Sequence, residues 1–489
     1  MFLKYFLKFL TMASNTRTSR TQIDYFESEL TEDEHAYGTD DDECVIEQLS
    51  QDDDGPPRKK RKLTPFQQLF ADVPTNNINI PELYQLHIPH NPLDFIHEDP
   101  EVYKDPYRLF MFIFEEGMQL LYDLNITRHK DHIIDKIAKS KPGSRAIGYN
   151  PLQLKDIHGF IGALFLMDIY IRPEIKMYWG YDGSLNKFKE ISNNMDYKLF
   201  VDLKNCLGMA DKNKLYQLIC TQSSLLIKPT LQVAVDEQLR LFTGAYANKI
   251  KMPSKPAGEG CHSYIIADSN SRLPLWYSIE GKGKLNYEVD TLTGYGKIAA
   301  SLAEPFGNVT LFVDNLYCTY QMCIYLQSKN IECVGTVRFN NLPPSLKILF
   351  TAFKKEKCIE VCTWHNELPV IQLHTRAYEI NGVFYIFVKD NGEFTMATNS
   401  KALFDKGWIR TTNRLDEKQR FRFGIASYKA YKIKPFIVGY YNSKMNSVDI
   451  IDQLLTSYDR HQRQSKWSMC YIYTAIKMAE TTAYTVYKK

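Results

Sequence analysis

The chain of 489 residues lacks features that define several classes of protein. It contains no Cys-x-x-Cys pair, and its ten cysteines are scattered along the sequence. This scatter excludes a secreted disulfide framework and favours reduced thiols inside a cell. No stretch reaches the roughly 18 uninterrupted apolar residues that a membrane-spanning helix requires, so we expect no membrane partner.

Positive charge is missing from one long segment near the start. Between Thr21 and Pro57 there are fourteen Asp or Glu residues and no Lys or Arg. A basic run follows at once: Arg58, Lys59, Lys60, Arg61 and Lys62. This charge pattern predicts a disordered tail over residues 1–75 that carries a nuclear import signal, with a solvated linker as the alternative. The first eleven residues fit either a transit peptide or a segment upstream of a start at Met12.

The pattern of apolar residues in the remaining sequence changes at Leu231. Before it, apolar residues recur at helical spacing, which predicts helices. After it, short β-branched and aromatic runs predict three consecutive antiparallel strands, followed by a strand, a helix and a further strand. Together with the acidic residues described next, this order predicts a mixed α/β fold with a core of the ribonuclease H and retroviral integrase type. A mainly helical flanking domain, a β-rich insertion and the disordered N-terminal tail complete the expected architecture.

These patterns divide the chain into segments. We predict a helical domain for dimerisation and DNA binding in two parts, 85–230 and 458–489. The ribonuclease-H-like core is also predicted in two parts, 231–341 and 429–457, on either side of an insertion at 342–428.

Four aspartates lie where predicted elements end or begin. Asp236 ends the apolar run LQVAVD, and Asp314 ends LFVD. Asp449 and Asp452 lie three residues apart near the start of a helix, on one face. Each acid alone also suits a helix cap or a partner for the helix dipole. Buried together, such carboxylates would raise each other's pKa, and divalent cations remove that cost. The pattern therefore predicts two Mg²⁺ or Mn²⁺ ions and a phosphodiester reaction.

Several ordered motifs together resemble the piggyBac-type transposases, from about residue 85 to the C-terminus. They are VDEQL, KIKMPSKPAGEG, FVDNLYCTYQMCIYLQSKNIECVGTVR and GYYNSKMNSVDIIDQL. The resemblance implies that Asp236, Asp314 and Asp449 form a catalytic triad, with Asp452 as a nearby fourth acid and metal ligand. It also implies a metal-dependent DNA transposase that cleaves and transfers strands at transposon ends, with TTAA targets and a hairpin intermediate.

Two departures from that family leave the activity open. Asn446 and Ser447 stand where many relatives carry two glycines before the third aspartate. Related transposases commonly end in a cysteine-rich, zinc-binding module, and we expect this chain to lack it, which puts recognition of transposon ends in doubt. The alternatives are a domesticated or truncated transposase-derived DNA-binding or chromatin protein without transposition activity, and a remnant with neither property.

Basic and aromatic residues near these motifs are candidates for DNA contact, because cations neutralise phosphates and aromatic rings stack on unpaired bases. The resemblance points to Trp467 as the stacking residue near a hairpin end; a partly buried aromatic is the alternative. For the basic residues the alternatives are a solvated loop or a surface salt bridge. The candidates are Lys249, Lys251, Lys255, Arg338, Arg460, Arg463, Lys466 and Trp467.

Two further patterns predict no cofactor. The set Cys358, Cys362, His365 and His374 has a Cys-x3-Cys spacing that fits zinc sites poorly, so we expect no zinc in this chain. The run EGKGKL lacks the full phosphate-loop pattern, so we expect no nucleotide cofactor. The expected partners are double-stranded DNA, as transposon ends and target, and a second copy of the chain, because paired ends must be brought together.

Overall fold

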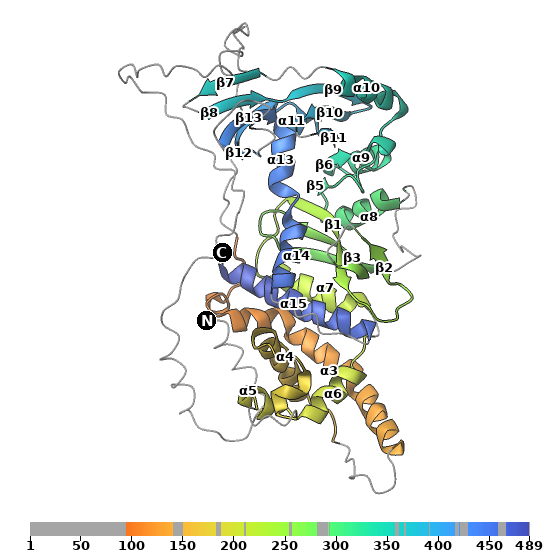
Figure 1. Cartoon of the computed structure of the whole chain (residues 1–489), viewed down its shortest axis with the longest axis vertical. Helices are drawn as coiled ribbons and strands as arrows, with labels where there is room; N and C mark the ends of the chain where they lie inside the picture. Colours follow the sequence, from red (N-terminus) through yellow and green to blue (C-terminus); the bar gives the residue numbers. More distant parts are fainter. Residues whose placement is uncertain are drawn as a thin grey trace, which may run out of the picture.

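The computed structural model describes most of the chain from residue 94 onward (Figure 1). The described ranges are 94–139, 150–181, 187–209, 212–253, 257–280, 292, 294–356, 361–365, 368–390, 392–415, 420, 429–457 and 466–488. The predicted tail with its basic run Arg58–Lys62 lies outside them, as do Lys255, Arg460 and Arg463. No helix within the described ranges is long and apolar enough to cross a membrane.

A helical unit precedes the sheet. Its helices are α3 (Pro106–Ala138), α4 (Leu154–Ile169), α5 (Lys189–Ser192), α6 (Tyr197–Cys206) and α7 (Lys212–Ser224). The long helix α3 begins at an Asp-Pro pair: Asp105 caps it by accepting a hydrogen bond from the Tyr107 amide at 2.8 Å, and Pro106 occupies the first turn. Two short 3₁₀ helices flank this unit, η2 (Pro100–Val102) and η3 (Ile175–Trp179).

The last helix of the chain completes this helical unit. Helix α15 (Trp467–Lys488) packs against α3 and α7, which lie more than 240 residues earlier in the sequence (Figure 1). One core holds aromatic side chains of α3 and α4 together with the buried stripe of α15. The apolar stripes that the sequence shows in these segments are therefore packing surfaces.

The central element is a nine-stranded sheet. Five of its strands are β1 (Gln232–Leu241), β3 (Gly258–Asp268), β4 (Pro274–Glu280), β5 (Thr310–Val313) and β6 (Glu332–Val337). Strand β3 pairs antiparallel with β1 and β4, whereas β1, β5 and β6 run parallel to one another. The short strand β2 (Ile250–Met252) pairs with β3 at the same edge as β4. Three antiparallel strands followed by two parallel ones is the order that the sequence predicts for a ribonuclease-H-like core.

Helices cover both faces of this sheet. On one face, alternate residues of β1 and β5 pack against α8 (Gly294–Ala303), α9 (Tyr320–Ser328) and α10 (Pro344–Lys355). On the other face, Ala234 and Phe312 pack against α13 (Phe436–Lys444). Because side chains alternate along a strand, odd-numbered residues of β1 face the first layer and even-numbered residues face α13.

The segment predicted as an insertion extends the sheet. Strands β11 (Glu393–Thr398), β10 (Val383–Lys389) and β9 (His374–Ile380) continue the order beyond β6, and β11 pairs directly with β6. A second sheet of four strands has the order β12-β13-β8-β7. Its strands are β7 (Val361–His365), β8 (Leu368–Gln372), β12 (Trp408–Arg414) and β13 (Lys429–Pro435). The sheet thus runs through the predicted boundary at residue 342 without a break in pairing.

The chain returns to the central sheet through β13. Helix α13 follows β13 directly, and α14 (Ser447–Ser457) follows α13. Helix α11 (Lys401–Phe404) lies next to α13, while the 3₁₀ turns η4 (Glu304–Phe306) and η5 (Phe339–Asn341) close the connections after α8 and β6. Figure 1 shows α14 beside β1 and above α15, so it joins the sheet to the helical unit.

Candidate active site

Asp236 and Asp314 occupy matching positions on two neighbouring parallel strands. Val235 of β1 stands opposite Val313 of β5 as the last pair of their shared register. Asp236 and Asp314 each follow these valines directly, one step further along. Neighbouring strands lie about 4.8 Å apart, and residues in the same register position point to the same face, here the face covered by α13. The fold therefore brings together two carboxylates that are 78 residues apart in the sequence.

Local hydrogen bonds hold both carboxylates. One oxygen of Asp314 accepts a hydrogen bond from the Leu316 amide at 2.7 Å, and one oxygen of Asp236 accepts from the Glu237 amide at 2.8 Å. Asp236 is buried, and only 8% of its surface is exposed. Burial raises the pKa of the Asp314 carboxyl, the negative charge of Glu237 raises it further, and Arg338 opposes both effects. A partly buried carboxylate whose charge is unfavourable in the free chain suits a cation ligand.

Helix α14 brings the other two acids to the same side of β1. Asp449 lies in its first turn and is exposed, and Asp452 follows one turn later, half-buried. The Gln238 side chain of β1 donates a hydrogen bond to the Asp452 carboxylate and accepts one from the Tyr277 hydroxyl. Because Gln238 and Asp236 lie two residues apart on one strand, α14 packs on the strand face that carries Asp236.

The carboxylates of these acids do not form one compact set of metal ligands in the described part of the chain. Among the described residues, the aspartates form no group of three whose carboxylate oxygens all lie within 4.8 Å of one another. Asp236 and Asp314 are register neighbours, Asp452 is joined to β1 through Gln238, and Asp449 remains exposed at the edge. The donor set consists of carboxylate oxygens, which Mg²⁺ and Mn²⁺ prefer, so the residue types fit such ions.

Two comparisons with known proteins bear on this arrangement. The model of a DDE transposase family, described as Transposase IS4, matches residues 105–484, which include all four aspartates and both sides of the helical unit. The chain belongs to this family. DDE transposases are metal-dependent phosphoryl-transfer enzymes, which agrees with paired carboxylates at the ends of parallel strands.

The second comparison is with a solved structure. The chain shares its fold with the piggyBac transposase, as determined by cryo-electron microscopy in a synaptic complex with hairpin DNA. The TM-score is 0.56 at 16% sequence identity, and the match covers 80% of this chain and 76% of that chain. The predicted resemblance to piggyBac-type transposases and the predicted mixed α/β fold are confirmed.

Tyr441 of α13 is a neighbour of the two strand aspartates that sequence reasoning missed. Burial is the main cause that raises the pKa of its hydroxyl, and the charges of Asp314 and Asp236 raise it further. A hydrogen bond with Thr336 of β6 opposes this effect. The tyrosine therefore lies on the covering helix within the electrostatic influence of both carboxylates. Only its place in the motif before Asp449 could have singled it out.

Glu237 has a structural role that differs from that of Asp236. Its carboxylate accepts a hydrogen bond from the Tyr317 hydroxyl at 2.9 Å, on the opposite face of β1. Burial, followed by the charges of Glu237 and Asp236, raises the pKa of Tyr317 well above its usual range. The buried pair joins β1 to the turn that follows Asp314.

Arg338 lies beside the second aspartate. Its guanidinium donates a hydrogen bond to the Asn315 side chain at 2.6 Å, and its charge acts on Asp314. The side chain is exposed at the end of β6. Asn315 thus holds a cation beside Asp314, and contact between Arg338 and DNA stays a prediction.

The lysines of the β2 region differ in their surroundings. Lys249 forms an ion pair with Glu259 of β3 at 3.2 Å, whereas Lys251 is exposed on β2. Lys255 lies outside the described residues. Contact between these lysines and DNA stays a prediction.

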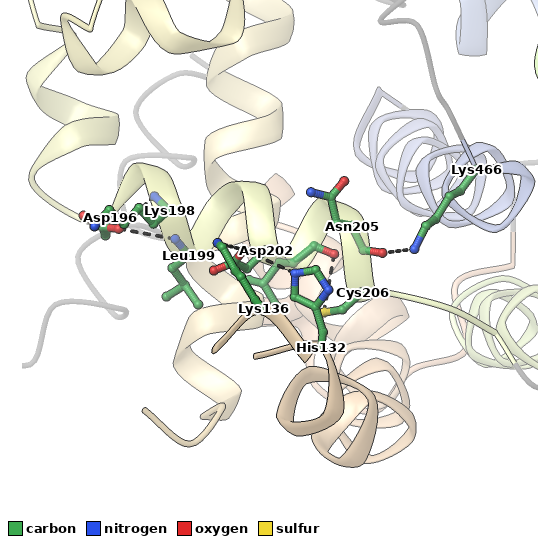
Figure 2. Close-up of polar contacts among 10 residues, drawn as sticks. His132, Lys136, Asp196, Lys198, Leu199, Asp202, Asn205, Cys206 and Lys466 are labelled. Carbon is green, nitrogen blue, oxygen red and sulfur yellow. Dashed lines mark hydrogen bonds and ion pairs between the residues drawn. The ribbon is translucent and has the colours of Figure 1, made fainter. Parts of the chain in front are cut away.

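The start of α15 holds the two remaining candidates. Trp467 is half-buried and stacks on Tyr246, with ring centroids 5.0 Å apart. The Lys466 ammonium group donates a hydrogen bond to the Asn205 carbonyl at the end of α6, a position that the helix dipole favours for a cation (Figure 2). Figure 2 also shows Lys136 and His132 of α3 meeting Asp202 of α6, so α6 is held from two sides. The predicted contacts of Trp467 and Lys466 with DNA stay predictions.

Asn446 and Ser447, at the positions of the family's two glycines, lead into α14 without backbone strain. Neither has a positive φ, so neither needs the conformational freedom of glycine. The Ser447 hydroxyl is buried and has no hydrogen-bond partner in the described part of the chain. The substitution therefore leaves the backbone path to Asp449 intact.

Proposed function

We propose that the chain is a piggyBac-like DNA transposase that cleaves and joins DNA strands at transposon ends. The observation that carries the proposal is the matched register of Asp236 and Asp314 at the ends of parallel strands, beneath the helix pair that presents Asp449. Membership of a DDE transposase family supports the phosphoryl-transfer chemistry. The shared fold with a transposase captured on hairpin DNA supports DNA as the substrate.

Each acid has a role in this proposal. Asp236 and Asp314 would hold the metal ions from β1 and β5, and Asp449 would complete the set from α14. Asp452 aligns that helix through Gln238. When bound, two Mg²⁺ or Mn²⁺ ions stabilise the attacking and leaving oxygens of a phosphodiester displacement. Because Asp449 is exposed and no three of the described carboxylates lie within 4.8 Å of one another, we propose that DNA binding draws Asp449 and the other two carboxylates together.

The other chain residues orient the DNA. Arg338, held by Asn315, faces the phosphate next to Asp314. Lys251 and the other basic candidates neutralise the backbone further along. TTAA targets, action as a homodimer and residence in the nucleus belong to the same proposal, and they rest on the sequence resemblance and the basic run at residues 58–62.

The deciding experiment compares two variants of the full chain on DNA that carries the element's own ends. Asp314→Asn keeps the hydrogen bond with the Leu316 amide but removes the negative charge. We expect it to lower Mg²⁺-dependent nicking by about a thousandfold or more, because a lost metal ligand removes several kcal/mol of transition-state stabilisation. Undiminished nicking would contradict the assignment.

The matched control is Asp405→Asn. Asp405 is exposed at the end of α11 and pairs only with a surface lysine among its described contacts, Lys401. This variant should nick DNA at the rate of the unchanged chain.

One observation favours a second candidate function, a transposase-derived DNA-binding protein without catalysis. The carboxylates of the described chain do not converge within 4.8 Å. If that separation persists on DNA, the unchanged chain will bind DNA in a salt-dependent manner and show no nicking with either Mg²⁺ or Mn²⁺.

A further inference from the structure

Three cysteine sulfurs meet beneath the second catalytic strand. The Sγ atoms of Cys318, Cys323 and Cys333 all lie within 4.8 Å of one another. They come from three different elements: the turn after β5, helix α9 and strand β6. All three side chains are completely buried. We call these residues the cysteine trio.

Polar contacts fix the backbone at each member of the trio. The buried Asn399 side chain accepts a hydrogen bond from the Cys333 amide at 2.7 Å and donates one to the Cys323 carbonyl at 3.1 Å. The Cys318 amide donates to the Asp314 carbonyl at 3.2 Å. Three sulfurs are thus held in place by contacts outside the trio, as outer contacts hold the ligands of metal sites.

The space around the trio leaves no room for adjustment. A Cβ atom at Gly335 would lie 3.0 Å from the Cys318 sulfur and 2.9 Å from the Val313 carbonyl oxygen, so only glycine fits there. The close approach of Gly335 thus packs β6 directly against the Cys318 sulfur.

A buried polar atom beside the trio lacks a partner. The Tyr385 hydroxyl of β10 is buried and makes no hydrogen bond in the described part of the chain. Tyr385 is in register with Ala397 of β11, which is in register with Gly335 of β6, and Tyr385 belongs to the same buried cluster as all three cysteines. A buried hydroxyl without a partner costs about 1–3 kcal/mol unless a ligand satisfies it.

The chemistry of three adjacent thiols favours a soft cation. Each cysteine offers one sulfur, and the three sulfurs lie within 4.8 Å of one another, close enough for a single ion to contact them together. A thiolate is the form that binds metal ions. Because an unpaired negative charge is costly in an apolar pocket, the bound cation would also offset the charge that remains when the thiols lose their protons.

We propose that the cysteine trio binds one soft, thiophilic cation, as three thiolates with the Tyr385 oxygen at its side. Thiolates select Zn²⁺ or Cu(I) among biological metals. Zn²⁺ requires a fourth donor, which the Tyr385 oxygen supplies, whereas Cu(I) is satisfied by three sulfurs. The spacing, with four and then nine residues between cysteines, matches none of the usual zinc motifs, so only the fold brings these residues to attention. The expectation of no zinc rests on a different set, Cys358, Cys362, His365 and His374.

Binding at the trio has a consequence for the candidate active site. The cation joins the turn after Asp314 to α9 and β6 through Cys318. It therefore fixes the segment that carries the second catalytic aspartate, without touching the carboxylate itself.

The test measures metal content and thiolate coordination in the full chain, purified anaerobically without chelators. We expect about one equivalent of zinc or copper per chain, removable by a strong chelator with a fall in the midpoint of thermal unfolding. Replacement with Co²⁺ should give sulfur-to-metal charge-transfer absorption if the native metal is zinc. Anaerobic titration with Cu(I) should give the corresponding ultraviolet band if it is copper.

Matched variants locate the site. Cys333→Ser should lose the bound metal and the charge-transfer band, whereas Cys220→Ser should keep both, because Cys220 is equally buried but lies in α7, away from the trio. If Cys333→Ser fails to fold, the stoichiometry and the charge-transfer band of the unchanged chain still decide.

Two results would overturn the proposal. One is a chain that binds neither Co²⁺ nor Cu(I) through sulfur while its three thiols remain reduced. The other is a disulfide within the trio after anaerobic purification.

Discussion

The negative charge of Asp314 is unfavourable to the folded chain when no cation is present. Burial and the neighbouring Glu237 both raise the pKa of this carboxyl. The positive charge of Arg338 lowers it but does not offset the two effects. A residue that costs stability in the free chain and lies beside a second acid is typical of a functional site. The unfavourable negative charge of Asp314 is one that a bound metal ion would neutralise.

This charge predicts a pH-dependent difference in stability between the unchanged chain and Asp314→Asn, both in EDTA. A carboxyl whose pKa is raised by folding loses stability as the pH rises through that raised value, whereas the amide does not titrate. The variant should therefore have the higher midpoint of thermal unfolding at pH 7.5. The difference should shrink as the pH falls toward the ordinary value of 3.8. Added Mg²⁺ should raise the midpoint of the unchanged chain only. A variant that is less stable at pH 7.5 would contradict this account of Asp314.

Helix α14 depends on strand β1 for its position. Besides the apolar packing of Val448 and Ile451 in the core, the Gln238 amide bonds both to the half-buried Asp452 carboxylate and to the buried Tyr277 hydroxyl. Helix and strand are more than 200 residues apart in the sequence, so these tertiary contacts set where Asp449 lies.

Gln238→Leu tests the role of this network. It leaves the Tyr277 hydroxyl and the Asp452 carboxylate without these hydrogen bonds, and we expect a loss of about 1–3 kcal/mol in the free energy of unfolding. Nicking should fall more than stability explains, because Asp449 is no longer aligned. The control, Gln327→Leu on the exposed face of α9, should change neither quantity. Denaturant unfolding and nicking rates at one temperature decide between these outcomes.

The order of the core strands could be predicted from the sequence, whereas the contacts between these strands and distant parts of the chain could not. The runs that end in Asp236 and Asp314 carry their own strand signal, since apolar residues and flanking turns are local features. Three features depend on residues far apart in the chain: the pairing of β6 with β11, the effect of the two aspartate charges on Tyr441, and the meeting of the three cysteines. No local pattern contains that information, which is why the sequence shows four candidate acids but not the helix that covers them.

The two ends of the described chain form one helical unit. Helix α15 carries Lys477, whose ammonium group contacts Asp168 of α4 at 2.5 Å and Glu480 at 2.9 Å in a nearly dry environment. Burial alone would lower the pKa of Lys477, but the charges of Glu480 and Asp168 raise it above its usual value. The helical unit therefore depends on a buried charge that connects residues 309 positions apart.

Lys477→Met removes that charge and leaves two carboxylates buried without their cation. We expect a loss of about 3–5 kcal/mol in the free energy of unfolding at pH 7. Because the raised pKa of Lys477 keeps it charged, its contribution should persist at neutral pH and disappear only as the pH rises through that value. The matched control, Lys401→Met, breaks an exposed ion pair with Asp405 and should cost less than about 1 kcal/mol. Equal effects of the two variants in chemical denaturation would contradict the importance of the buried pair.

The most direct measurement of the central claim is a structure of the full chain bound to its transposon-end DNA with Mn²⁺, using anomalous scattering to locate the ions. We predict Mn²⁺ between Asp236 and Asp314 next to a DNA phosphate, with Asp449 drawn in to a ligand distance of about 2.1 Å. Ions that bind elsewhere, or an Asp449 that stays at the exposed edge while the other two hold no metal, would contradict the account.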